Sequence, residues 1–256
     1  MVSPIMLAVF VIALGAAALP APCWQRTGAP AADAPPESRP NLPAETRGDI
    51  FMARKMYREA IETYQTVQPR TAVLWNKMGI AYHQLTELDK ARKHYDASLR
   101  VNAKYAEAIN NLGTIHYAKK SYRRAVNQYK KALLITPNSA SIYSNLGTAL
   151  FARKKYDDAF AAYQTALSMD PEVFEHRSSH GVLLQERSVE ERAKFHFYLA
   201  KTYAKAGMND RALLYLRKAL EEGFQERRRL REDPEFAQMQ ELPEFKELLA
   251  LQPRVL

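Results

Sequence analysis

Apolar residues recur at helical spacing through the middle of the chain and predict short helices in pairs. In residues 106–118 the apolar positions lie three residues apart, so they form one stripe along a helix. A polar turn separates this stretch from a second one at residues 123–135. Pro137 then predicts the end of the pair, because proline lacks the backbone N–H that a helix needs. The predicted buried positions are Ile109, Leu112, Ile115, Ala125, Val126, Tyr129, Ala132 and Leu133.

The same pair of helices recurs with a period of 34 residues. Glycine, alanine and tyrosine each repeat at this interval, and three columns with one period indicate an internal repeat. The small residues predict a close crossing of two antiparallel helices, and the tyrosines predict the bulky partners that fill the remaining space. The columns are Gly79, Gly113 and Gly147; Ala91, Ala125 and Ala159; and Tyr95, Tyr129 and Tyr163.

These columns resemble the tetratricopeptide repeat, whose pattern is Trp-x2-Leu-Gly-x2-Tyr followed by an alanine, an aromatic residue, an alanine and a proline. The repeat near Trp75 carries Gly79 and Tyr82 of this pattern, and the next two repeats end at Pro137 and Pro171. A weaker first repeat contains Gly48, Phe51, Ala60 and Tyr64, and a fifth contains His196, Leu199, Ala200, Tyr203, Ala212, Leu216 and Ala219.

The resemblance implies an all-α fold, a right-handed solenoid of about five helical hairpins over residues 44–224. The fifth repeat follows the fourth by more than one period, so an insertion is expected at about residues 172–191. Residues 225–256 contain two prolines that each precede Glu-Phe, and they predict a C-terminal helical cap over the last apolar face. The residues expected to cover that face are Phe236, Phe245, Leu248 and Leu249.

The N-terminal part of the chain predicts export. Residues 5–19 form an apolar run as long as a signal-peptide core and shorter than the roughly 20 residues of a membrane span. We therefore expect residues 1–23 to be a cleaved signal peptide. A signal peptide usually has a Lys or Arg before its apolar run and this chain has none there, so an uncleaved membrane anchor is the alternative. Lipidation of Cys23 is not favoured, because it needs a small residue directly before the cysteine and this chain has Pro22. Residues 24–43, rich in proline and alanine, predict an extended linker.

The positive charge of the chain is concentrated in one region. The formal net charge is +9, and residues 53–131 alone hold 16 Lys and Arg against 6 Asp and Glu. Such a region could meet nucleic acid, an anionic lipid or an acidic protein, or could only keep a helical protein in solution. The single cysteine, Cys23, excludes an internal disulfide and a thiolate metal cluster.

No residue pattern predicts catalysis, a metal site or a cofactor. His176 and His180 have the spacing of two metal ligands on a helix, but the sequence offers no third ligand, and a polar insertion surface explains them better. His116 stands where the repeat usually has tyrosine, and it is expected to be a packed core residue.

The resemblance places the candidate binding site on the inner face, the side of each first helix that lines a groove in this family. The asparagines there could bond to the backbone of a bound peptide, or could bond within the repeats. If they hold a partner, changing Asn111 and Asn145 to alanine should weaken binding and leave the melting temperature nearly unchanged. Inner-face positions of the fifth repeat are Lys194, Phe197, Lys201 and Lys205. The candidate partner-binding residues are Asn76, Asn110, Asn111, Thr114, Tyr117, Ser144, Asn145, Thr148 and Phe151.

A second candidate surface lies at the turns inside the repeats. Stacking places equivalent turns along one edge, and the cations there predict either a basic ridge or a row of solvated helix ends. The residues of this basic edge are Lys119, Lys120, Arg153, Lys154 and Lys155.

Two functions stay open at this point. In the first, the chain is a non-catalytic scaffold that binds a peptide or a partner subunit in the groove of a tetratricopeptide superhelix, in the bacterial envelope. In the second, the chain is a non-catalytic accessory subunit of an envelope enzyme complex. Both expect a protein partner, no nucleic acid and no cofactor, and a location in the periplasm or at a membrane.

Overall fold

The computed structural model of the chain describes residues 42–175 and 188–250. The expected export segment and nearly all of the linker lie outside the described residues. So do His176 and His180, together with most of the expected insertion. None of the helices in the described ranges is long and apolar enough to cross a membrane.

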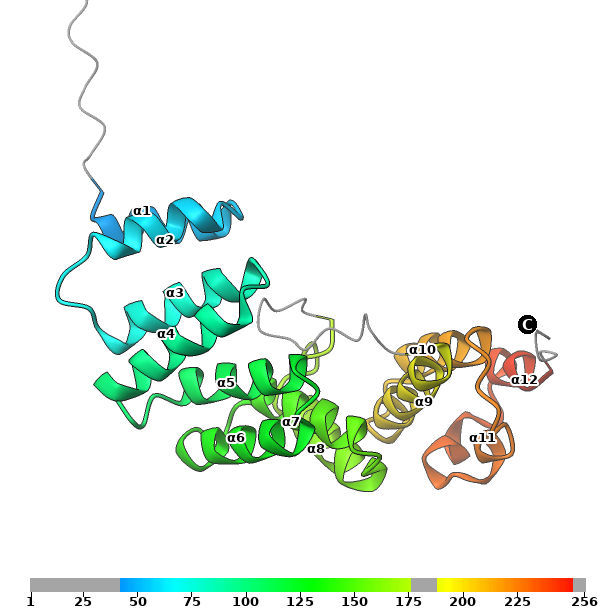
Figure 1. Cartoon of the computed structure of the whole chain (residues 1–256). Helices are drawn as coiled ribbons and strands as arrows, with labels where there is room; N and C mark the ends of the chain where they lie inside the picture. Colours follow the sequence, from blue (N-terminus) through cyan, green and yellow to red (C-terminus); the bar gives the residue numbers. More distant parts are fainter. Residues whose placement is uncertain (1–41, 176–187, 251–256) are drawn as a thin grey trace, which may run out of the picture. The chain divides into compact units, whose positions relative to one another are not determined.

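The regular elements of the described residues are all helical, and ten of the helices form five consecutive hairpins (Figure 1). The second helix of each of the first four hairpins also packs against the first helix of the next hairpin. This arrangement confirms the predicted all-α solenoid of helical hairpins. The hairpins are α1 (Ala44–Ala53) with α2 (Tyr57–Gln65), α3 (Ala72–Gln84) with α4 (Leu88–Val101), α5 (Ala106–Ala118) with α6 (Tyr122–Ile135), α7 (Ala140–Ala152) with α8 (Tyr156–Met169), and α9 (Val189–Lys205) with α10 (Asn209–Glu221).

In four of the hairpins a buried tyrosine ring lies against a glycine of the opposite helix. A Cβ atom on Gly113 would lie 2.5 Å from Cε1 of Tyr129, much closer than two carbon atoms approach. The glycine is therefore needed for the tyrosine ring to pack, and the first repeat, weak in sequence, has the same geometry. The four pairs are Gly48 with Tyr64, Gly79 with Tyr95, Gly113 with Tyr129, and Gly147 with Tyr163.

In the fifth hairpin a different pair of residues packs where the two helices cross. Ala200 and Leu216 stand at the positions of the glycine and the tyrosine, and both are fully buried. A larger residue on one helix is thus matched by a smaller one on the other, which conserves the packed volume.

Two residues after the first helix of each hairpin ends, the chain has a residue with a positive φ. The angle is between 56° and 61° in Lys55, Thr86, Lys120 and Lys154, and it is 74° in Gly207. A left-handed conformation costs an L-residue about 1–2 kcal/mol, which glycine avoids. Three of the five turns therefore hold a lysine where glycine would be less strained.

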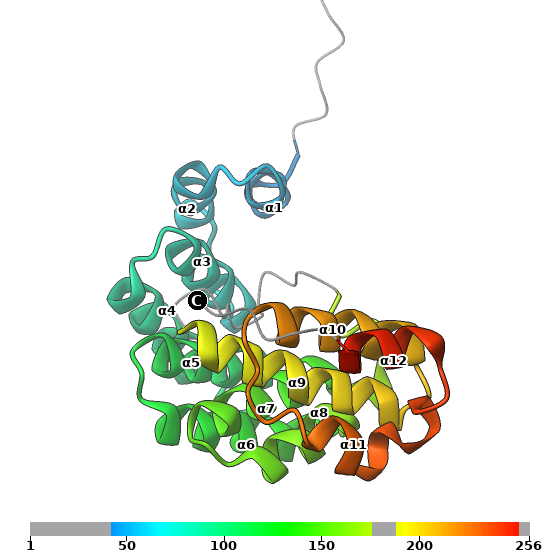
Figure 2. The same ribbon diagram turned by 90° about the vertical axis from the view of Figure 1, so that its right-hand side faces the viewer.

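After α10 the chain forms a cap on the last hairpin (Figure 2). Phe236, Phe245 and Leu248 are buried, and Leu249 packs against the same core while staying partly exposed. The 3-10 helix contacts α9 and the last helix contacts α10, so the predicted helical cap is confirmed. Its elements are α11 (Arg229–Glu232), η1 (Pro234–Met239) and α12 (Pro243–Ala250).

Candidate partner-binding surfaces

The four asparagines of the candidate site bond to one another. Asn111 Nδ2 donates to Asn76 Oδ1 at 2.9 Å, and Asn145 Nδ2 donates to Asn110 Oδ1 at 3.1 Å. Asn110 Nδ2 lies 3.4 Å from Asn111 Oδ1, which links the two pairs. All four side chains are buried. The amides therefore form a polar seam between α3, α5 and α7, and their contact with a partner stays a prediction.

This amide seam changes one expectation. A buried acceptor that loses its donor costs about 1–3 kcal/mol, and Asn111→Ala would strip Asn76 Oδ1 of its bond. The hydrogen bonds of the amide seam therefore favour a lowered melting temperature in the Asn111 and Asn145 double variant, in place of the nearly unchanged value expected from the sequence.

Between α1 and α3, charged side chains stand at the repeat positions that the amides occupy further along the array. Lys77 Nζ lies 2.8 Å from Glu45 Oε1 and 2.8 Å from Asp49 Oδ2. Burial lowers the pKa of Lys77, but hydrogen bonds to Asp49 and Glu45 outweigh it and hold that pKa above its ordinary value. Asp49 also accepts a hydrogen bond from the Tyr64 hydroxyl at 2.7 Å. The seam thus consists of ion pairs between the first and second repeats and of amide bonds at the next two junctions between repeats.

The two candidate threonines serve the buried tyrosines. The Tyr129 hydroxyl donates to Thr114 Oγ1 and the Tyr163 hydroxyl donates to Thr148 Oγ1, each at 3.3 Å. The equivalent position in the second repeat is Ile80, which has no acceptor, and among the described residues the buried Tyr95 hydroxyl has no hydrogen-bond partner.

Phe151 packs between hairpins instead of facing outward. Its ring lies edge-on to Phe195 at 5.5 Å and to Tyr198 at 5.9 Å, both on α9. Tyr117 and Ser144 are the two members of the candidate set that are only partly buried. The inner face thus offers a partner these two residues, while the other seven are buried.

The residues of the basic edge are all exposed, but acidic residues partly neutralise them. Lys119 Nζ pairs with Asp89 Oδ1 at 2.5 Å, and Lys155 Nζ lies 3.6 Å from Asp158 Oδ2. Whether this edge meets a partner stays a prediction.

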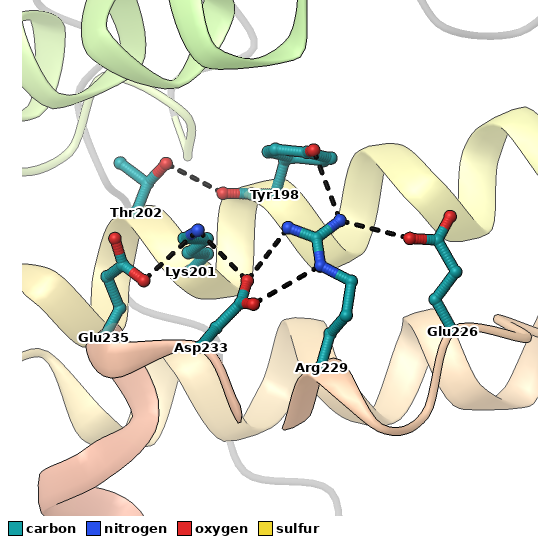
Figure 3. Close-up of polar contacts among 7 residues, drawn as sticks. All are labelled: Tyr198, Lys201, Thr202, Glu226, Arg229, Asp233 and Glu235. Carbon is teal, nitrogen blue, oxygen red and sulfur yellow. Dashed lines mark hydrogen bonds and ion pairs between the residues drawn. The ribbon is translucent and has the colours of Figure 1, made fainter. Parts of the chain in front are cut away.

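Of the expected inner-face residues of the fifth repeat, Lys194, Phe197 and Lys201 are at least partly covered by the chain itself, whereas Lys205 is exposed. Figure 3 shows the cover over Lys201. Lys194 Nζ lies 2.9 Å from Glu226 Oε1. Lys201 Nζ lies 3.0 Å from Asp233 Oδ2 and 3.2 Å from Glu235 Oε2, the latter an ion pair without hydrogen-bond geometry. Residues 226–235 therefore place three carboxylates on two lysines of α9.

Arg229 holds this segment in place (Figure 3). Its Nη2 and Nε donate to the two oxygens of Asp233 at 2.9 Å and 3.4 Å, and its Nη1 donates to the Tyr198 hydroxyl at 3.3 Å. The guanidinium carbon lies 4.8 Å from the ring centre of Phe197, which stacks on Phe224 at 4.2 Å. Burial raises the pKa of Asp233, but the bonds from Arg229 and then from Lys201 outweigh it and hold that pKa below its ordinary value. Residues 226–235 contain as many arginines as acidic residues, so their net charge gave no sequence signal for this docking. The usable signal was the placement of Glu226, Asp233 and Glu235 after a helix rich in lysine.

The described residues contain no group of three or more His, Cys, Asp or Glu side chains placed to hold a metal ion. The structure does not test the spacing of His176 and His180, which lie outside the described ranges.

Comparison with known families identifies the repeats. Residues 72–105 and 140–173 match models of the tetratricopeptide repeat, and residues 113–152 match a further model of the TPR repeat. Among curated proteins, none matches this chain significantly.

Several solved structures are similar to this chain at low sequence identity. The Cut9 and Hcn1 hetero-tetramer of the APC/C is 19% identical with a TM-score of 0.51, covering 81% of this chain and 35% of that one. A crystal structure of MamA is 21% identical with a TM-score of 0.47, covering 68% of this chain and 93% of that one. MamA from Desulfovibrio magneticus RS-1 is 19% identical with a TM-score of 0.48, covering 70% and 92%. Proteins built from such repeats generally act as scaffolds that bind proteins or peptides. With three matched segments and five hairpins of this type, the chain belongs to the tetratricopeptide repeat superfamily.

Proposed function

We propose that this chain is a non-catalytic scaffold that holds a partner protein or peptide in the bacterial envelope. The observation that carries the proposal is the docking of residues 226–235 on α9. There, a segment outside the five hairpins is held by ion pairs to Lys194 and Lys201 and by packing of Arg229 on Phe197. A segment of another protein would dock on α5 and α7 by packing on an aromatic side chain, as Arg229 packs on Phe197, because these two helices contain no lysine or arginine for ion pairs.

Tyr117 and Ser144 are the inner-face positions where we place the contact with this partner. Both retain exposed surface, whereas the amides beside them are used inside the fold. Tyr117→Ala should weaken binding by more than about 1 kcal/mol, as loss of an aromatic anchor does. Because Tyr117 also packs on the core and on Tyr122, binding is measured well below the melting temperature of the variant. Tyr57→Ala is the matched control, because it removes a partly buried tyrosine from α2, two hairpins before Tyr117. Unchanged binding by Tyr117→Ala would exclude the inner face.

Recovery of the partner from native membranes tests the scaffold function. The tagged full chain should retain one stoichiometric protein without enzymatic activity. A Gly113→Leu chain, whose array should collapse, is the control and should retain none. An enzyme as the stoichiometric partner would instead support the accessory-subunit function, and recovery of no partner would refute both.

The envelope location rests on the apolar run at residues 5–19. Residues 1–45 fused to a reporter that is active only outside the cytoplasm should give activity. The same reporter fused to residues 24–45 should give none. A silent first fusion would contradict export.

A further inference from the structure

A hollow of about 540 Å³ lies on the outside of the third hairpin, away from every residue of the candidate inner-face site. It opens between the end of α5 and the exposed side of α6. His116, expected from the sequence to pack in the core, is only partly buried and faces this hollow. The lining residues are His116, Arg124, Asn127, Gln128, Lys130 and Lys131.

The lining carries three cations and no carboxylate. Within the described part of the chain, Arg124, Lys130 and Lys131 form no ion pair. Helix α6 adds Arg123 and contains no acidic residue, whereas α4, α8 and α10 each contain acids. The hollow therefore gathers three cations of the basic region, residues 53–131, whose charge no acidic residue of the described chain pairs with.

The other polar groups of the hollow suit hydrogen bonding to an acid. Asn127 and Gln128 each offer amide donors and an acceptor. Burial, followed by the charges of Arg124 and Arg92, lowers the pKa of His116, so its ring is neutral at pH 7 and can donate one hydrogen bond. A carboxylate placed here would meet cations and neutral donors together.

An exposed apolar side chain stands on the same face of α6. Leu134 is 86% exposed, the largest exposure among the exposed large hydrophobic residues of the described chain. It follows Lys130 by four residues and Lys131 by three, so the three side chains are neighbours on the helix surface. A ligand that extends from the hollow past Lys130 and Lys131 would reach this leucine, which does not itself line the hollow.

We propose that this hollow binds an acidic segment of a partner protein, in which Asp or Glu residues flank an apolar side chain. The carboxylates pair with Arg124, Lys130 and Lys131, and the apolar side chain packs on Leu134. Leu134 gives a nucleic-acid backbone nothing to bind, and no lining residue is a Phe, Tyr or Trp that would stack a base. A concave site with two amides also fits single side chains better than it fits a flat lipid surface.

Binding of a dye-labelled peptide of Glu-Glu-Leu repeats to the full chain tests the proposal by fluorescence anisotropy. Arg124→Gln with Lys131→Gln should raise the Kd about tenfold or more, since two charge pairs are lost. The matched control is Arg58→Gln with Arg217→Gln, which removes the same charge from exposed positions of α2 and α10 and should leave the Kd within about twofold. Leu134→Ser should weaken binding of the Leu-containing peptide and leave binding of an all-Glu peptide unchanged.

Three results would overturn the proposal. The first is equal binding by the Arg124 and Lys131 variant and the parent, with melting temperatures showing that both are folded. The second is equal binding of a Gln-Gln-Leu peptide, which would remove the role of charge. The third is binding to phosphatidylglycerol vesicles that shows the same sensitivity to these variants and displaces the peptide, which would make the surface a lipid site.

Discussion

Replacing Gly113 by alanine changes the free energy of unfolding through two effects of opposite sign. Inside a helix, alanine is favoured over glycine by about 0.5–1 kcal/mol, because glycine loses more backbone entropy on folding. The new Cβ, however, would lie 2.5 Å from Cε1, 2.8 Å from Cδ1 and 3.0 Å from Cζ of Tyr129. Relaxed carbon contacts need about 3.5–4.0 Å, so the ring must move by about 1 Å.

Tyr129 has little room for that movement. The ring is fully buried, the neighbouring Ala125 and Ala132 are fully buried as well, and the hydroxyl is bonded to Thr114. Overpacking of a core costs about 1–3 kcal/mol. With the helix gain subtracted, Gly113→Ala should lose about 1–2 kcal/mol of unfolding free energy.

Urea unfolding of the full chain, followed by circular dichroism, measures this loss. Ala161→Gly, at an exposed position of α8, calibrates the helix term and should lose about 0.5–1 kcal/mol. Combining Gly113→Ala with Tyr129→Leu reproduces the Ala200 and Leu216 pair of the fifth hairpin. The double variant should therefore lose about 1 kcal/mol less unfolding free energy than the two single variants lose in sum. A Gly113→Ala chain more stable than the parent, or two losses that simply add, would refute the argument.

Three further predictions concern groups inside the fold. Tyr95→Phe should leave the unfolding free energy unchanged or raise it, because the lost hydroxyl has no partner, whereas Tyr129→Phe should lose about 0.5–1.5 kcal/mol in the same urea titration. Asn111→Ala with Asn145→Ala should lower the melting temperature measured by calorimetry, and an unchanged value would mean that the amide seam does not stabilise the array. The lowered pKa of Asp233 adds stability that is present above about pH 4 and is lost as the pH falls through the folded-state value. The difference in melting temperature between the parent and Asp233→Asn should therefore shrink below about pH 4, and a constant difference would contradict this sign.

The sequence by itself determined the repeats, the hairpins and the cap. These depend on short-range patterns: a stripe of apolar positions makes a helix, a proline ends it, and a column of glycines facing a column of tyrosines marks where two helices cross. Even the exchange of the glycine and tyrosine for Ala200 and Leu216 is readable along the chain, because the two positions stay the same number of residues apart.

The tertiary structure alone decided which side chains a partner can reach. Asn76 pairs with Asn111 and Asn110 pairs with Asn145, each 35 residues apart and not 34, because the first helices meet one residue off the repeat period. One residue turns a helix face by about 100°, so the period could not tell a groove-facing amide from one that faces the neighbouring helix. The covering of α9 by residues 226–235, and the opening of the hollow beside His116, likewise depend on how separate segments pack. No local pattern along the chain records that packing.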